Sequence, residues 1–321
     1  MHIGIEEIEY YLPERLISSN ELSDKFGFAL DFVEEKIGVR QIYVAGDKEF
    51  SSDLAVSAAE KLFLRRPDIR EKIDVIVVCT QTPDFQLPHT SALVQKKLGL
   101  KNETACFDIG LGCSGFVYGL SIVSSFMESN KLDYGLLITS ETYSKIIQDT
   151  DKNTKPLFSD GAAVSLISRK PILMPMQFTF GTNGDKYDKL ICDSKNNGLL
   201  PHGGTLFMDG RGVYELVASV VPRDIKKCLL LNNLDINDID LFVFHQASRF
   251  MIESLSVILG LDKNDERVVN YIGQFGNTVS SSIPIALSII LKNKTNDQER
   301  KILISGFGVG LSWASTVLKQ L

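Results

Sequence analysis

The sequence predicts an α/β fold built from two similar halves. Two observations carry this prediction: strand and helix patterns alternate along the chain, and the same order of elements occurs twice. Apolar runs of strand length separated by helical stretches are typical of mostly parallel sheets that helices cover on both faces. The repeated order indicates two stacked α/β halves related by a pseudo-twofold axis.

Each half has a helical stretch followed by a buried strand. These pairs lie at residues 53–63 and 72–79 in the first half and at 212–230 and 238–245 in the second. Both strand patterns are apolar runs after an aspartate, which favours strands in the middle of a sheet. A further helix then ends in Leu-Gly-Leu, at residues 98–100 and 259–261.

The second part of each half repeats a short strand, a glycine-rich turn and an apolar helix. This pattern covers residues 107–126 in the first half and 268–291 in the second. A last strand follows, at residues 136–140 and 302–305 respectively. Because all these strands, turns and helices occur in the same order in both halves, we expect the two halves to share one topology.

Basic residues and prolines between residues 168 and 175 mark the expected boundary between the halves. We therefore expect one unit over residues 1–170 and the other over residues 171–321. Residues 177–211 are rich in glycine, asparagine and aspartate and show no clear periodicity, which predicts a loop. A loop of this length in a compact protein often caps a site or forms an interface.

Composition restricts the class of protein. A chain of 321 residues with 44% hydrophobic residues can build a large core, and a net charge of -6 argues against nucleic acid as a partner. No apolar run approaches the roughly 18 residues of a membrane span, so we expect a cytoplasmic protein. The five cysteines are scattered without a CxxC pair, which predicts neither a disulfide framework nor a metal site.

Cys113 is the main candidate for chemistry. It lies where a strand-like run turns through Gly110 and Gly112 into an apolar helix. A helix N-terminus presents unpaired N–H groups and partial positive charge, which favours thiolate over thiol. The alternative is a buried, inert cysteine, which is the commoner role of a free cysteine.

Two further residues have the position and chemistry to join Cys113. His245 ends a buried strand, at the sheet edge where ligand sites collect, and Asn277 precedes the apolar helix that corresponds to the one after Cys113. Each has a structural alternative: the histidine can bond a backbone carbonyl, and the asparagine can cap a helix or turn. The pseudo-symmetry favours convergence of the three side chains on one pocket.

Seven short motifs, in this order, resemble the β-ketoacyl-acyl carrier protein synthase III family of the thiolase superfamily over nearly the whole chain. They are Tyr11–Glu14, Ile37–Arg40, Gly112–Phe116, Ser159–Ala162, His245–Ala247, Gly276–Thr278 and Gly306–Trp313. The resemblance implies a thiolase-like, five-layered αβαβα arrangement and a homodimer. It also implies an acyltransferase of fatty acid biosynthesis that uses no permanently bound cofactor.

The resemblance also assigns roles to individual residues. Cys113 would accept an acyl group from acyl-CoA or acyl-carrier protein, with the backbone N–H groups of Cys113 and Val309 as the oxyanion hole. His245 and Asn277 would support decarboxylation of malonyl-acyl carrier protein. The enolate formed in that step would condense with the acyl group on Cys113. Apart from the resemblance, the position of Glu141 after the last strand of the first half allows it either to position the cysteine loop or to form a buried hydrogen bond, and we interpret it as structural.

Several positions depart from the family pattern. Phe32 and Lys36 occupy the places of a tryptophan and an arginine that hold the coenzyme A adenine, and Lys152 replaces a second nucleotide-binding arginine. Arg249 is the candidate for carrier docking, one place earlier than usual. These departures leave both coenzyme A and carrier protein open as acyl donor.

Leu87 matches a position where the family often has a phenylalanine that reaches the acyl pocket of the neighbouring subunit. We expect the smaller side chain to admit longer or branched acyl groups. Two other functions stay open at this point. One is an acyltransferase that moves the acyl group to an oxygen or nitrogen nucleophile, in secondary metabolite or surface glycan synthesis, and the other is a non-catalytic subunit of a synthase complex.

Overall fold

A computed structural model describes residues 3–193, 204–293 and 299–321. The first half contributes five strands to the main sheet, and three helices pack against them. These elements are β1 (Gly4–Tyr11), α2 (Ser51–Arg65), β4 (Val75–Cys79), α3 (Thr90–Leu98), β5 (Ala105–Ile109), α4 (Gly115–Asn130), β6 (Tyr134–Glu141) and β7 (Gly161–Ser168).

An excursion between β1 and α2 forms a small separate layer at one end of the molecule. It contains β2 (Arg15–Ser18), α1 (Ser19–Phe26), η1 (Phe32–Ile37) and β3 (Gln41–Val44). A capping box between Ser18 and Glu21 fixes the start of α1, and Gly27 ends the helix with a φ of 69°. The face of this excursion that packs inward includes Leu22, Val33 and Ile42.

The second half repeats most of the elements of the first half and adds several short ones. Its strands and helices are β8 (Leu173–Pro175), β9 (Thr179–Thr182), β10 (Leu190–Cys192), β11 (Leu206–Met208), α5 (Gly210–Leu231), β12 (Leu241–Phe244), α6 (Arg249–Leu259), α7 (Ile272–Phe275), α8 (Ser282–Lys292), β13 (Lys301–Gly308) and β14 (Ser312–Gln320). Short helical segments include η3 (Tyr143–Lys145), which lies between β6 and β7 of the first half, and η4 (Gly184–Lys189), η6 (Val279–Ser281) and η7 (Val309–Leu311) of the second half.

The strand order confirms the predicted duplication, but the expectation of mostly parallel pairing is wrong. β4 pairs in parallel with β5 and β6, and β12 with β13, whereas the other pairs of the main sheet are antiparallel. β13 and β14, for example, are joined by the short η7 and not by a crossover helix, so they run antiparallel.

The order of the strands is β5-β4-β6-β7-β1 in the first half, and in the second β12-β13-β14 is followed by β8 and β9. The second-half counterpart of β5 is a single parallel bridge between Phe242 and Val268. β8 pairs with both β1 and β14, so hydrogen bonds join the two halves into one ten-stranded sheet.

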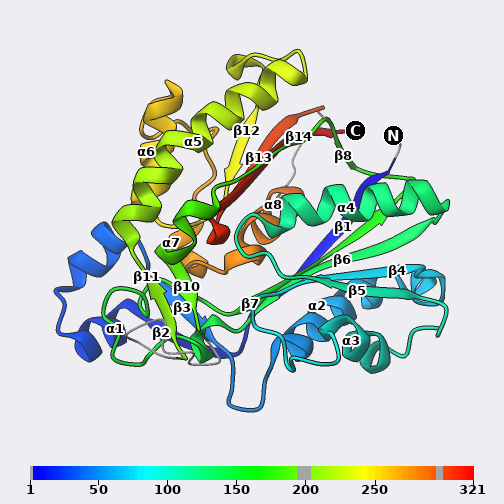
Figure 1. The fold of residues 1–321 in the computed structure, drawn as a ribbon, viewed down its shortest axis with the longest axis horizontal. Helices are drawn as coiled ribbons and strands as arrows, with labels where there is room; N and C mark the ends of the chain where they lie inside the picture. The colour runs from blue at the N-terminus through cyan, green and yellow to red at the C-terminus, as the bar shows by residue number, and fades with distance from the viewer. Residues whose placement is uncertain (1–2, 194–203, 294–298) are drawn as a thin grey trace.

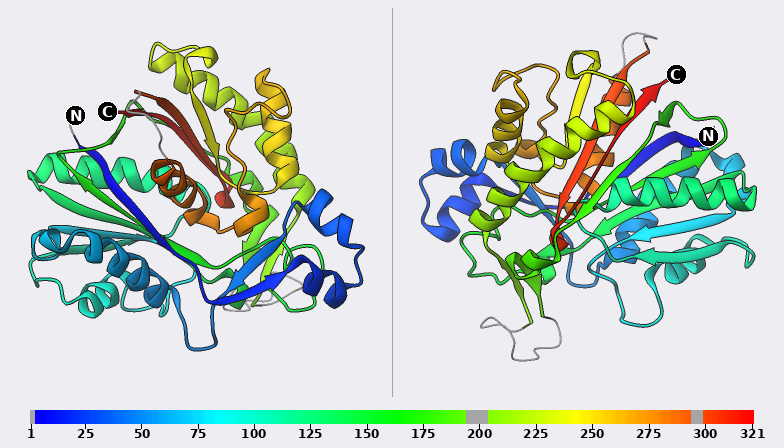
Figure 2. Two further views of the ribbon diagram at one scale, coloured as in Figure 1. Left: turned by 180° about the vertical axis from the view of Figure 1, so that it is seen from behind. Right: turned by 45° about the horizontal axis from the view of Figure 1, so that its top comes forward.

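The layers of the fold follow from which faces of the helices and of the sheet are apolar. α4 and α8 pack between the two sets of strands, while α2 and α3 cover the outer face of the first set and α5 and α6 that of the second (Figure 1). Seen from behind, α8 lies beside α4 in this central layer (Figure 2). The predicted αβαβα arrangement is therefore confirmed.

The central helix α4 is apolar on most of its surface because strands lie on both sides of it. Phe116, Leu120 and Val123 are fully buried. Gly119 lets the helix approach β6, since a Cβ at this position would lie 2.7 Å from Leu137. This close packing fixes the direction in which the start of α4 points.

Residues 177–211 are not a single loop. β9 pairs with β14 in the main sheet, and β10 and β11 form a separate hairpin. Strands of three or four residues are too short to produce a clear periodicity in a sequence rich in glycine and asparagine. Residues 194–203 of this stretch lie outside the described residues. The division at residue 170 stays a prediction; β7 ends at Ser168 and β8 begins at Leu173.

Candidate active site

Cys113 lies between β5 and α4, one residue before Ser114, the N-cap of α4. The turn is closed by a hydrogen bond from the N–H of Gly115 to the carbonyl of Gly112, at 2.7 Å. Gly308 of the second half faces the side chain, since a Cβ there would lie 2.8 Å from the sulfur of Cys113. The thiol is 5% exposed and lies where the two halves meet.

His245 follows β12, at the end of the strand where the sequence predicts it. Its backbone N–H donates to the carbonyl of Ser305 at 2.8 Å, which continues the pairing of β12 with β13. Its ring nitrogen Nδ1 lies 2.7 Å from the hydroxyl of Ser282, the first residue of α8. The side chain is 1% exposed, and helix α8 therefore fixes the ring from one side.

Asn277 lies in the turn between α7 and η6. Its Oδ1 accepts a hydrogen bond from the N–H of Val279 at 2.9 Å, and its Nδ2 donates to the carbonyl of Ala247 at 3.3 Å. These two contacts fix the direction of the amide and leave one N–H of Nδ2 for a ligand. Val279 has a φ of 53°, which is rare and strained for a β-branched residue.

The structure brings Cys113, His245 and Asn277 together in one cavity of about 130 Å³. The rest of the lining is largely apolar. It includes Leu157, Phe158, Leu190, Met208, Val213, Val217, Met251 and Phe307. A small pocket with a thiol, an imidazole and an amide among apolar side chains is suited to thioester chemistry that excludes water.

The charge state of Cys113 differs from the sequence prediction. Burial, the largest cause, and the nearby Glu141 carboxyl together raise the pKa of the Cys113 thiol to about 12, while the backbone N–H groups of Cys113 and Val309 partly oppose this shift. The predicted preference for thiolate at the helix start is therefore wrong, and the thiol form is favoured. Burial and a carboxyl contributed by β6 outweigh the favourable end of α4.

His245 is neutral for a related reason. Burial lowers the pKa of its imidazole to about 3, with a partial opposing effect from the backbone of Val279. A neutral ring has one N–H donor and one acceptor nitrogen. The residue can therefore donate a hydrogen bond at neutral pH without adding a positive charge to the cavity.

Glu141 is fully buried near Cys113 and accepts hydrogen bonds from three donors. The donors are the N–H of Gln81 at 3.1 Å and the hydroxyls of Thr82 and Ser280, each at 3.0 Å. Burial raises the pKa of this carboxyl to about 8 despite these donors. Glu141 thereby ties the end of β6 to the loop after β4 and to the second half, in agreement with the structural role predicted for it.

A second, larger cavity of about 770 Å³ is lined in part by residues of η3 and η7. Its lining includes Gln81, Tyr143, Leu190, Leu206, Val309 and Gly310. The hydroxyl of Tyr143 donates to the side-chain carbonyl of Gln81 at 2.6 Å. The sequence carries no signal for this pair, because the two residues lie far apart in the chain and belong to no recognisable motif.

The residues predicted at the periphery of the site are dispersed. Phe32 and Lys36 lie on the exposed side of η1, where Phe32 contacts the ring of Phe28 at a centroid distance of 5.1 Å. Arg249 begins α6 beside η1 and forms an ion pair with Glu35 at 3.0 Å. The sequence gives no sign of this ion pair with Glu35. Because of it, the guanidinium of Arg249 is only partly free to contact a carrier protein.

Lys152 and Leu87 lie outside the cavity that holds Cys113. Lys152 is exposed and lines a separate surface hollow with Asp151, Thr205 and Phe207. Leu87 is 85% exposed and lines neither the small nor the large cavity of its own chain. An acyl-pocket role for Leu87 therefore requires a second copy of the chain.

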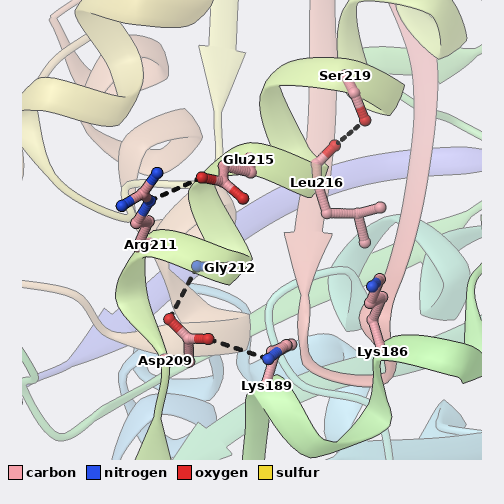
Figure 3. A pocket seen from close by; sticks show the side chains of 8 residues that line it. All are labelled: Lys186, Lys189, Asp209, Arg211, Gly212, Glu215, Leu216 and Ser219. Atoms are coloured by element: carbon pink, nitrogen blue, oxygen red, sulfur yellow. Dashed lines mark hydrogen bonds and ion pairs between the residues drawn. The ribbon is translucent and has the colours of Figure 1, made fainter.

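Another hollow, of about 530 Å³, lies at the start of α5 and carries mostly charged side chains (Figure 3). Lys189 pairs with Asp209 at 3.1 Å, and Arg211 pairs with Glu215 at 2.8 Å. Most of the charge is thus compensated within the hollow. Within the described ranges, we find no cluster of histidine, cysteine, aspartate and glutamate suited to a metal, and no helix that could cross a membrane.

Comparison with known proteins agrees with this fold and site. Residues 107–184 match the family model for 3-oxoacyl-[acyl-carrier-protein (ACP)] synthase III, and residues 229–320 match the model for its C-terminal part. The chain is 34% identical to a β-ketoacyl-[acyl-carrier-protein] synthase III of Halalkalibacterium halodurans, over 98% of this chain and 96% of that protein. A relative from Streptococcus sanguinis is 32% identical, over 98% of both chains.

A solved structure of the β-ketoacyl-[acyl carrier protein] synthase III from Thermus thermophilus is also similar. It superposes with a TM-score of 0.89 at 31% sequence identity, over 98% of both chains. The fold and the similarity together define a condensing enzyme of the thiolase fold, an acyltransferase. The chain belongs to the 3-oxoacyl-[acyl-carrier-protein] synthase III family.

Proposed function

We propose that Cys113 accepts an acyl group from a thioester and that the acyl group then condenses with malonyl-acyl carrier protein. The observation that carries this proposal is the convergence of Cys113, His245 and Asn277 on one buried cavity, although they come from both halves of the chain. A thiol, a neutral imidazole and an oriented amide are the groups that the two steps need.

The first step is thioester exchange. The sulfur of Cys113 attacks the carbonyl carbon of the donor thioester, the bond from that carbon to the donor sulfur breaks, and the thiol proton passes to the departing donor thiolate. The backbone N–H groups of Cys113 and Val309, which lower the pKa of the thiol, support a role as oxyanion hole. The high pKa of Cys113 means that the proton leaves during attack rather than before it.

The second step is decarboxylative condensation. The malonyl thioester loses carbon dioxide, and the electron pair of the broken carbon–carbon bond forms an enolate. N–H donors from neutral His245 and Asn277 stabilise the enolate oxygen, and the enolate carbon attacks the acyl carbonyl on Cys113. The carbon–sulfur bond breaks, and Cys113 leaves as a thiolate that takes up a proton.

Contacts with the donor and carrier are proposed at the periphery. Phe32, Lys36 and Lys152 would contact the nucleotide of acyl-CoA, and Arg249 would contact acyl carrier protein after release from Glu35. We propose that the enzyme acts in the cytoplasm, as a homodimer, without a permanently bound cofactor, nucleic acid or membrane partner. We retain residues 1–170 and 171–321 as its two halves.

Leu87 is proposed to enter the acyl pocket of the neighbouring copy, which its 85% exposure in a single chain supports. A leucine at this position would leave more space there than a phenylalanine. Replacement of Leu87 by phenylalanine should reduce loading of branched acyl groups relative to acetyl. An unchanged preference would contradict this assignment.

The decisive experiment offers the purified protein a panel of acyl-CoA and acyl-carrier thioesters and measures the intact mass. We expect one acyl group per chain, on Cys113, and carbon dioxide release when malonyl-acyl carrier protein is added. Cys113→Ala should show no acyl adduct. Condensation at the normal rate by Cys113→Ala, or the absence of any adduct with every thioester, would refute the proposal.

A further inference from the structure

Two cavities are lined by the two members of one pair of stacked rings. Phe158 lines the cavity of about 130 Å³ that holds Cys113, and Tyr143 lines the cavity of about 770 Å³ beyond it. The two rings stack with centroids 5.2 Å apart and an interplanar angle of 25°. Leu190 lines both cavities. The stack and Leu190 thus form the partition between them.

This partition belongs to the immediate surroundings of the nucleophile. Tyr143, Phe158 and Leu190 pack in one apolar cluster together with Cys113. Tyr143 and Phe158 are 2% and 3% exposed, so both rings are held by neighbours on several sides. An acyl chain that extends from the sulfur toward the larger cavity would have to pass the Tyr143 ring.

Tyr143 is also held at its polar end. Its hydroxyl donates to Gln81 at 2.6 Å, and the backbone N–H of Gln81 donates to buried Glu141 at 3.1 Å. The side chain of Gln81 lies against Gly112, the residue before Cys113, where a Cβ would overlap it. Rotation of Tyr143 out of the partition would leave its hydroxyl without this partner inside the protein.

We propose that Tyr143, tethered by Gln81, is a specificity-determining residue that closes the space beyond Cys113 to long acyl chains. This inference rests on the proposed acylation of Cys113. The larger cavity is the space that a longer chain would occupy when the ring is absent. Its lining of Leu190, Ile191 and Leu206 is suited to an alkyl chain.

The test compares acylation rates with acetyl-, butyryl-, hexanoyl-, octanoyl- and decanoyl-CoA, measured by intact mass. In the unmodified protein, acetyl or butyryl should load faster than decanoyl by about tenfold or more. Tyr143→Ala should reduce this ratio by about tenfold or more, mainly through faster loading of the long chains. Tyr143→Leu, which disturbs the core less, should change the ratio in the same direction.

Phe63→Leu is the matched control for Tyr143→Leu. Phe63 is also a 2% exposed aromatic residue, but it packs among α2 and its neighbours, in a cluster that does not include Cys113. Phe63→Leu should lower thermal stability without changing the ratio of short to long chains. If Tyr143→Ala does not fold, the ratio of short-chain to long-chain loading in Tyr143→Leu is compared with the ratio in Phe63→Leu. A lower ratio in Tyr143→Leu alone supports the role of Tyr143.

The outcomes separate this inference from the proposed function. If the unmodified protein loads decanoyl as fast as acetyl, or if the folded Tyr143 variants keep its length profile, the partition is refuted and acylation of Cys113 stands. If no thioester loads Cys113, the proposed function itself fails, and the inference fails with it.

Discussion

The hydroxyl of Ser282 lies 2.7 Å from Nδ1 of His245. The same oxygen accepts a hydrogen bond from the backbone N–H of Gln246 at 3.3 Å. The first residue of α8 therefore holds both the imidazole and the peptide that follows it. Since the turn before this helix carries Asn277, one segment of the chain positions both proposed donors to the enolate.

We predict that Ser282→Ala slows decarboxylation of malonyl-acyl carrier protein by about tenfold to a hundredfold, because the imidazole loses its fixed orientation. The rate of Cys113 acylation should change much less. Ser288→Ala is the matched control, since Ser288 is buried in the same helix and donates to the carbonyl of Ile8 at 3.0 Å. Equal losses in both variants would show that Ser282 only supports the fold.

Replacement of His245 or Asn277 by alanine should separate the two steps of the reaction. Each variant should still form the acyl adduct, whereas carbon dioxide release should fall by about a hundredfold to a thousandfold, the usual effect of removing one oxyanion donor. Intact mass reports the first step and trapped carbon dioxide the second. A loss of acylation that equals the loss of decarboxylation would contradict this division.

Glu141→Gln should make the Cys113 thiol more acidic. The carboxyl raises the pKa of Cys113, and the isosteric amide removes this charge. At pH 9, we expect iodoacetamide to alkylate Cys113 faster in the variant than in the unmodified protein. Asp160→Asn is the control, because Asp160 is another buried carboxyl with a raised pKa but is no cause of the shift at Cys113. Unchanged alkylation in Glu141→Gln would refute the effect.

The same substitution predicts a change in stability with pH. The pKa of Glu141 is raised from 4.5 to about 8 in the folded state, so the folded protein binds more protons than the unfolded chain between these values. Glu141 therefore lowers the free energy of unfolding as pH rises through this window. In Glu141→Gln this contribution is absent, and we expect a smaller loss of stability between pH 5 and 8, by a few kcal/mol at most.

Denaturant unfolding of both proteins at several pH values measures this difference. The changed hydrogen bonds add a difference in the free energy of unfolding that does not depend on pH. Once this constant difference is subtracted, the two curves of stability against pH should converge toward pH 4.5 and separate toward pH 8. Parallel curves over the whole range would show that Glu141 is ionised in the folded protein.

Gly308→Ala should block the nucleophile. A Cβ at Gly308 would lie 2.8 Å from both Cβ and Sγ of Cys113, so the thiol would have to move from its place beside the Val309 amide. We expect acylation to fall by about a hundredfold or more, given the effect of small displacements on reacting groups. Gly184→Ala is the control, since no atom lies within 4 Å of the position that its methyl group would take, and it should acylate normally.

The sequence predicted the repeated elements and the three central residues because each has a local signal. Glycines mark the turn into α4, a buried strand leads to His245, and the correspondence of the two halves relates Asn277 to Cys113. The charge state of Cys113 had no such signal, since it depends on burial by both halves and on Glu141. Likewise, the contacts of Tyr143 with Gln81 and of His245 with Ser282 join distant parts of the chain.

The pairing of β8 with both β1 and β14 has a consequence for how the enzyme loses activity on heating. The backbone passes from one half to the other through a strand that is hydrogen-bonded to both. Neither half can melt without freeing an edge of the other, and each alone would carry only part of the site. Heat inactivation and loss of the fold should therefore coincide, with no partly folded species that retains one of the two chemical steps.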